Sequence, residues 1–179
     1  MSNTSGVAHA PAIAVATAVL AVLAAIGSLV SNKSASQALA AKNQAILVRT
    51  EAADAYNSYE AHVIRERIYE AAQASNPSLA GAALERLATI AREEQSAAKP
   101  YLERAEAQEQ LAGAANERSE QYARAHDTYD VAVTLVEIAI AIVSVSALTS
   151  SLYLIGLGGF CAAAGVAVFL YEFARGSMP

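Results

Sequence analysis

The chain has 179 residues with a formal net charge of −5, 55% hydrophobic residues and no tryptophan. The acidic balance, without clustered Lys and Arg, excludes an electrostatic basis for nucleic-acid binding. Cys161 is the single cysteine, so an intramolecular disulfide and a metal site built from paired cysteines are excluded.

Charged residues are concentrated in the middle of the chain. Residues 1–32 contain no Asp, Glu, Lys or Arg, and Glu137 is the only such residue between positions 131 and 171. Apolar ends of this length are typical of membrane-spanning segments. We therefore predict an all-α integral membrane protein with three transmembrane helices. Its expected parts are a tail with the first span (1–31), a helical central region (32–129) and a C-terminal transmembrane hairpin with its tail (130–179).

The first apolar segment, from Ala10 to Val30, has the roughly 20 residues that a helix needs to cross a bilayer. A cleavable signal peptide would carry Lys or Arg before a shorter apolar core, and this segment has neither feature. A buried helix of a soluble protein would keep one polar face. The segment therefore favours a membrane span.

The central region reads as helical because residues 33–74 lack Gly and Pro and are rich in helix formers. The sequence Ser75-Asn76-Pro77-Ser78 predicts the end of this helix. Pro100 predicts a second interruption at Lys99, since the residue before a proline disfavours helical geometry.

Beyond Pro100, one set of residues recurs in alternating steps of four and three, the 3.5-residue repeat of helices wound on a partner. This predicted seam consists of Tyr101, Ala105, Gln108, Ala112, Ala115, Ser119, Tyr122, His126, Tyr129 and Val133. We expect it to form a coiled-coil-like helical hairpin outside the membrane. Its partner is either residues 33–74 of the same chain or another subunit, and an alanine-rich helix without a packing role is the alternative.

The C-terminal apolar stretch, residues 131–171, is too long for one span, because as a helix it would extend about 60 Å. The polar triplet Thr149-Ser150-Ser151 divides it into expected antiparallel spans at 131–148 and 152–171. The last span has small residues four apart, a spacing that favours close helix contacts in lipid. These residues are Gly158 with Ala162, and Cys161 with Gly165.

Basic residues near the span ends predict the membrane orientation, because Lys and Arg are enriched on the cytoplasmic side. They are Lys33, Lys42, Arg49, Arg118, Arg124 and Arg175. All of them lie on one side of a three-span arrangement. We expect the N-terminus outside, and the central region and C-terminus in the cytoplasm.

A polar stripe along one helix face contains the strongest candidates for function. It consists of His126, Asp130, Thr134, Glu137 and Ser144. An ionisable residue within a span, such as Glu137, is costly and suggests a buried pairing or a path for protons or ions. Glu137 also lies near the start of its span, so its side chain could reach toward the interface.

Two stretches of the chain resemble the bacterial domain-of-unknown-function family 4337. These are AADAYNSYEAHVIRERIYEA, residues 52–71, and HDTYDVAVTLVEIAIAIVSVSALTSS, residues 126–151. The resemblance implies a three-span protein of the bacterial inner membrane with no assigned activity. The chain differs from the family pattern at Tyr56, where a Trp is expected, and in the uncharged hairpin turn.

The sequence contains no nucleophile–base pair, metal cluster or phosphate loop, so we expect neither an enzyme nor a bound cofactor. The favoured hypothesis is a membrane-anchored accessory protein that associates with itself or with a larger membrane complex. A small channel or transport-coupling protein that uses Glu137 and Asp130 is the alternative. In both hypotheses the lipid bilayer is a partner and nucleic acid is not.

Overall fold

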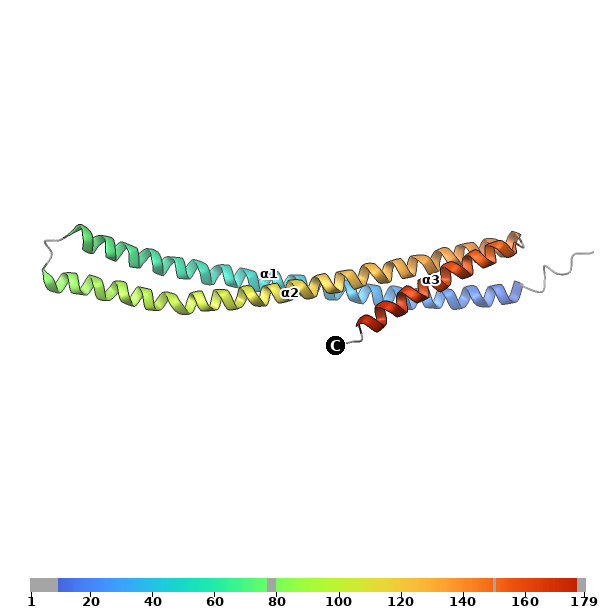
Figure 1. Ribbon diagram of the computed structural model, residues 1–179, viewed down its shortest axis with the longest axis horizontal. Coiled ribbons are helices and arrows are strands. Elements are labelled where there is room, and N and C mark those ends of the chain that lie inside the picture. The colour runs from blue at the N-terminus through green and yellow to red at the C-terminus, as the bar shows by residue number, and fades with distance from the viewer. Residues whose placement is uncertain (1–9, 77–79, 150, 177–179) are drawn as a thin grey trace, which may run out of the picture. The chain divides into compact units, whose positions relative to one another are not determined.

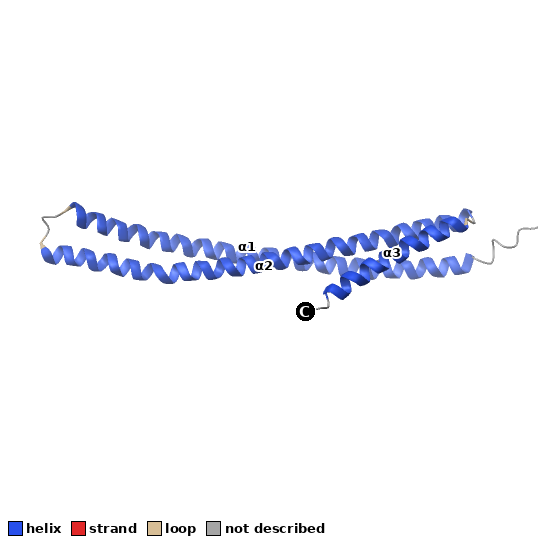
Figure 2. Cartoon of the chain, in the orientation of Figure 1, coloured by secondary structure: helices blue, strands red, loops and turns tan. Residues whose placement is uncertain are grey.

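The computed structural model describes residues 10–76, 80–149 and 151–176. They form three helices, α1 (Ala10–Ser75), α2 (Gly81–Thr149) and α3 (Leu152–Gly176), with short connections between them (Figure 1 and Figure 2). The described chain is therefore all-helical. Each helix is long and apolar enough to cross a membrane, judged by its length and composition.

The helices end at the polar sequences that the chain places between its apolar runs. Helix α1 ends at Ser75, and Thr149 and Leu152 bound the connection between α2 and α3. Ser, Asn and Pro favour turns because their side chains compete with, or remove, helical hydrogen bonds. Parts of the predicted turns and tails lie outside the described residues, namely Pro77, Ser78, Ser150, residues 1–9 and residues 177–179.

The predicted interruption at Pro100 is wrong, because α2 runs through this residue. A proline inside a helix removes one hydrogen bond and costs about 3 kcal/mol. The carbonyl left without a helical hydrogen bond is that of Ser96, four residues before Pro100. Ser96 is exposed, so water can bond to this carbonyl. Ala98 and Ala105 are both buried on one face of α2. The packing face therefore continues in register across the proline, and this packing opposes a break.

Close contacts divide the chain into two compact units. The first, here the three-helix unit, contains the described parts of residues 1–39 and 119–179. The second, here the two-helix unit, contains residues 40–118. The division predicted from the sequence, at residues 31 and 129, follows the expected membrane boundaries, whereas these units follow the contacts between helices.

In the three-helix unit, α2 packs against both of the other helices. The buried side chains of α2 between residues 131 and 148 are small or β-branched, which lets neighbouring backbones approach closely. They are Ala132, Val136, Ala139, Val143 and Ser146. Val133, the last position of the predicted seam, is only half-buried. The buried face has shifted by one residue to Ala132, because α3 joins α1 against this part of α2.

In the two-helix unit, residues 40–75 of α1 and 81–118 of α2 run antiparallel and side by side (Figure 1). Lys42 bonds Asn116 at 2.7 Å, whereas His62, further along α1, bonds Glu94 at 2.6 Å. The buried apolar residues between these helices are all alanines. They are Ala45, Ala52, Ala55, Ala91, Ala98, Ala105, Ala112 and Ala115. Alanines bury little apolar area each, so this contact gains its stability from its length.

Candidate functional site

The closest polar contact between α1 and α2 in the three-helix unit joins Ser31, His126 and Asp130. The Ser31 hydroxyl oxygen lies 2.7 Å from His126 Nδ1 and 2.5 Å from Asp130 Oδ1. Ser31 is 2% exposed, whereas the side chains of His126 and Asp130 are 30% and 59% exposed. We call these three residues the polar clamp, because they tie the buried face of α1 to the edge of α2.

The directions of the hydrogen bonds in the polar clamp follow from the donors available. A carboxylate only accepts, so the Ser31 hydroxyl donates its single hydrogen to Asp130. The serine oxygen can still accept, and His126 Nδ1–H donates to it. The buried hydroxyl of Ser31 is therefore satisfied on both sides by residues of α2, which makes it an interhelical contact rather than an isolated polar group.

The geometry of the polar clamp does not fit nucleophilic catalysis. In a hydrolytic triad the carboxylate orients the histidine, and the histidine activates the serine. Here Asp130 binds the serine directly, and Asp130 Oδ2 lies 3.7 Å from His126 Nε2, beyond a hydrogen bond. The serine is also buried between helices, where a substrate could not reach it. The arrangement supports helix association.

Replacing Ser31 by Ala is expected to lower the free energy of unfolding by about 1 kcal/mol. Both α2 partners are partly exposed, so water can replace the lost hydroxyl and the cost stays near the value of one net hydrogen bond. Thermal unfolding of the purified chain in mild detergent, followed by circular dichroism, measures the change. Ser36→Ala is the matched control, because Ser36 is exposed and bonds only the carbonyl of Asn32. Equal stability of the two variants would contradict a stabilising clamp.

The rest of the predicted polar stripe is not brought into this clamp. Thr134 Oγ1 donates to the carbonyl of Asp130 at 2.8 Å, and Ser144 Oγ donates to the carbonyl of Ile140 at 2.7 Å. Both hydroxyls thus bond within their own helix. Glu137 is exposed on the surface of α2. The stripe divides into the clamp residues His126 and Asp130 and an outward-facing group.

Three glycines mark the closest approaches within the three-helix unit. A Cβ atom added at Gly27 of α1 would lie 2.7 Å from Val133 Cγ2, and one at Gly158 of α3 would lie 2.7 Å from Val143 Cγ2. At Gly165 it would lie 2.8 Å from the carbonyl oxygen of Ala132. Of the predicted packing residues of α3, Gly158 and Gly165 are buried, and Cys161 and Ala162 are half-buried.

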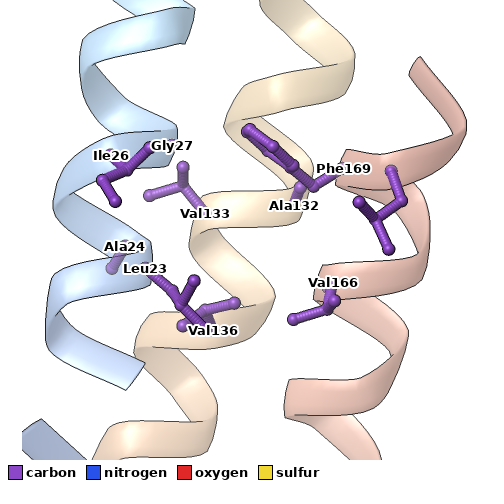
Figure 3. A pocket seen from close by; sticks show the side chains of 11 residues that line it. Leu23, Ala24, Ile26, Gly27, Ala132, Val133, Val136, Val166 and Phe169 are labelled. Atoms are coloured by element: carbon purple, nitrogen blue, oxygen red, sulfur yellow. The ribbon is translucent and has the colours of Figure 1, made fainter. Parts of the chain in front are cut away.

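An apolar groove of about 140 Å³ lies among the three helices beside two of these glycines (Figure 3). Figure 3 shows Val133 of α2 pointing toward α1 and Val166 of α3 pointing toward α2. The lining contains no charged side chain. Its residues are Leu23, Ala24, Ile26, Gly27, Ala132, Val133, Val136, Gly165, Val166, Phe169 and Leu170. A surface of this kind accommodates apolar groups.

Tyr129 lies just before the expected span 131–148 and is 7% exposed. Its ring packs against Phe169 of α3 at a centroid distance of 5.2 Å. Burial, and secondarily the negative charge of Glu172, raises the pKa of the Tyr129 phenol above its usual value of 10.0. The phenol is therefore neutral at physiological pH and acts as a packing group.

Besides exposed pairs such as Lys42–Asn116, two part-buried polar contacts join the helices of the two-helix unit. His62 bonds Glu94 at 2.6 Å and stacks on Tyr101, with ring centroids 5.3 Å apart. The buried Gln108 donates its side-chain N–H to Glu51 at 2.8 Å, while its Oε1 is buried without a hydrogen-bond partner among the described residues. A buried polar residue within an apolar seam favours one register over shifted alternatives, at a cost in stability.

The predicted seam of α2 is largely buried, at Ala105, Gln108, Ala112 and Ala115 in the two-helix unit and at Ser119 and Tyr129 in the three-helix unit. Tyr101 and Tyr122 each remain 37% exposed, and the Tyr101 ring stacks on His62. His126 is half-buried, as its place in the polar clamp requires.

Sequence reasoning confined to α2 misses Ser31, although a signal for it exists in α1. Buried and half-buried residues of α1 follow the same alternating steps of four and three. They include Ala24, Gly27, Ser31, Ser34, Ala38, Ala41, Ala45, Val48, Ala52, Ala55, Tyr59 and His62. The small residues Gly, Ala and Ser dominate this repeat, and for that reason it does not stand out as an apolar stripe. The repeat places Ser31 on the face toward α2.

Comparison with known sequences assigns the chain to a family. Residues 9–175 match the family described as a domain of unknown function, DUF4337. A search of curated proteins found no match, and a search of solved structures found none. The matched residues include all of α1 and α2 and nearly all of α3. The chain belongs to the DUF4337 family.

Proposed function

We propose that this protein is a non-enzymatic, multi-pass membrane protein that serves as an accessory or scaffolding subunit. In this proposal the three-helix unit anchors the chain in the bilayer, and the two-helix unit forms an extramembrane helical hairpin that offers binding surfaces. The observation that carries the proposal is an inversion of the usual burial pattern. Most buried side chains in both units are small, and many large apolar ones are exposed.

In the three-helix unit the exposed apolar side chains come from all three helices. They include Val15 of α1, Leu148 of α2, and Leu152, Phe160 and Leu170 of α3, each more than half exposed. Water would disfavour such a surface, and lipid chains would accept it. The small buried residues complement this exterior, because helices in lipid associate through close backbone contact. Both features support an anchoring role.

The two-helix unit shows the same inversion but carries many charges, so lipid is a poor solvent for it. Ile46, Leu47, Ile64, Ile68 and Leu111 are each more than half exposed there. Ile64 and Ile68 are neighbours on one helix face. Contiguous apolar surface on a water-facing element is typical of a protein contact. A protein partner for residues 40–118 therefore fits the pattern better than an isolated spacer.

The orientation and compartment belong to the same proposal. The basic residues that flank the apolar segments support a cytoplasmic two-helix unit and C-terminus, with the N-terminus outside. The resemblance of residues 52–71 and 126–151 to bacterial sequences supports the bacterial inner membrane. A reporter fused after residue 90 should therefore be active only as a cytoplasmic reporter, and activity outside the cell would contradict this orientation.

Alkaline extraction of membranes followed by purification in gentle detergent tests the functional proposal. We expect the chain to remain in the membrane fraction and to purify in a complex of more than one polypeptide, as determined by native mass measurement. Release by alkali, or a monomer without associated protein, would contradict an anchored accessory role. Cation flux into liposomes that contain only this chain would instead favour the channel hypothesis, in which Glu137 and Asp130 line a water-filled path.

A further inference from the structure

The outward-facing side of α2 carries a second regular set of residues within its apolar segment. Thr134, Glu137, Ala141 and Ser144 are all exposed and follow steps of three and four. We call this set the outer seam. It lies opposite the buried Ala132, Val136, Ala139 and Val143, so neither α1 nor α3 covers it. Three of its four side chains are small, and three are polar.

Glu137 makes this outer seam unfavourable in contact with lipid alone. It is the only charged residue between positions 131 and 171, and this stretch contains no Lys or Arg that could neutralise it. Among the described residues, none forms a hydrogen bond or ion pair with its carboxyl group. A carboxyl group inside a bilayer is costly without a polar partner. Glu137 therefore lacks a polar partner among the described residues, and a second chain is a suitable source of one.

The other polar groups of the outer seam indicate what that partner offers. The hydroxyls of Thr134 and Ser144 donate to carbonyls of their own helix, so their oxygens face outward as acceptors. A protonated carboxyl group supplies a donor, either to the Thr134 oxygen one helical turn away or to a second carboxylate. The outer seam thus contains both hydrogen-bond acceptors and a hydrogen-bond donor, so two identical seams can bond to each other.

We propose that the outer seam is the contact surface for a second copy of this chain, related by a two-fold axis. Two copies inserted in the same orientation bring identical residues to the same depth, as an isologous contact requires. Glu137 of one copy then meets the partner's Glu137, and the two carboxyl groups share a proton because two adjacent carboxylates would repel. The small residues around them let the two α2 helices approach closely.

This inference rests on the membrane location in the proposed function. It goes beyond that function by naming the partner and the surface. A transmembrane helix that carries Lys or Arg is the rival occupant, since it would pair with an ionised Glu137. The two occupants differ in their response to a neutral amide at position 137, which preserves hydrogen bonding and removes the charge.

The first test measures association of the full chain in phosphatidylcholine liposomes. Donor- and acceptor-labelled copies, tagged at the C-terminus, report association by energy transfer as the lipid-to-protein ratio rises. We expect Glu137→Gln to associate as the wild type does. Glu137→Leu should associate between about 3-fold and 30-fold more weakly, the range for one polar contact between membrane helices. Phe160→Leu, at an exposed position of α3, is the control and should change nothing.

The second test locates the contact by disulfide formation in a Cys161→Ser background. Ala141→Cys and Ser144→Cys should cross-link two copies, because the seam brings equivalent Cα atoms within the range that a disulfide spans. Val19→Cys, at an exposed position of α1, should not. Circular dichroism of each variant verifies that its helices are intact.

Four results would overturn the inference. They are a wild-type chain that stays monomeric in liposomes, unchanged association of Glu137→Leu, a loss in Glu137→Gln as large as in Glu137→Leu, and cross-linking at Val19 as efficient as at Ala141. The third result would show that hydrogen bonding at position 137 does not hold the two copies together. Loss of a co-purifying protein from Glu137→Gln, together with no self-association in liposomes, would instead identify the basic helix as the occupant. A chain that resists alkaline extraction and purifies with a different protein, but fails these tests, would retain the proposed function and lose only this inference.

Discussion

Replacing Gly165 by Ala is expected to separate α3 from α2, although alanine is the better helix former. The added Cβ atom would lie 2.8 Å from the carbonyl oxygen of Ala132 and 2.9 Å from Val136 Cγ2. A backbone oxygen within a helix cannot move aside as a flexible side chain can. Overpacking of this kind costs about 1–3 kcal/mol, against a gain of about 1 kcal/mol from helix propensity, so the net loss is up to about 2 kcal/mol.

The three-helix unit provides matched controls for Gly165 within the same helix. A Cβ atom at Gly156 or Gly159 would meet nothing within 4 Å. Gly156→Ala and Gly159→Ala should therefore leave the unfolding midpoint unchanged or raise it, while Gly165→Ala should lower it by up to about 8 °C. Thermal unfolding of the full chain in mild detergent measures all three. A midpoint for Gly165→Ala equal to that of its controls would show that α3 does not pack at this distance.

Replacing Ala105 by Leu should produce a loss of similar size in the two-helix unit. Ala105 is 0% exposed at the centre of the alanine contact, so a larger side chain has no room unless the helices move apart. The expected loss in free energy of unfolding is about 1–3 kcal/mol. Limited proteolysis of the full chain reports it, because separated helices expose the backbone of residues 40–118 to cleavage.

Ala107→Leu is the control for Ala105→Leu, because Ala107 is exposed one half-turn away on the same helix. Leu and Ala have similar helix propensities, so the two variants differ only in packing. Cleavage of Ala107→Leu should match that of the wild type. If Ala105→Leu is cleaved no faster than Ala107→Leu, the alanine contact is looser than its burial indicates.

The helix type and the main turns follow from local sequence signals. The apolar runs, the polar triplet at Thr149 and the Ser, Asn and Pro cluster after Ser75 are strong enough to place the helix ends. Pro100 shows the limit of such signals. The proline disfavours helix by about 3 kcal/mol, but buried alanines before and after it keep α2 continuous. Packing between α1 and α2 outweighs the local preference of proline against helix. This packing involves residues far apart in the sequence, so the residues around Pro100 do not predict it.

The polar clamp and the outer seam depend on which face of α2 is covered, and the sequence of α2 alone does not determine this. His126, Asp130 and Glu137 share a helical stripe in the sequence, yet the first two bond Ser31 and the third faces outward. The division arises because α1 lies beside one edge of the stripe. The shift of the buried face from Val133 to Ala132 has the same origin, since it requires the presence of α3.

The antiparallel contacts of the two-helix unit also bear on how this region folds. Its hydrogen-bonded pairs are nested, with the two partners 32 residues apart at His62–Glu94, 57 at Glu51–Gln108 and 74 at Lys42–Asn116. Each pair, once formed, shortens the loop that the next pair must close. The entropic cost of closing the loop is therefore divided among several small increments. We expect the two helices to pair first at the end where they are connected and then progressively toward Lys42 and Asn116. The bond between Gln108 and Glu51 then selects the register.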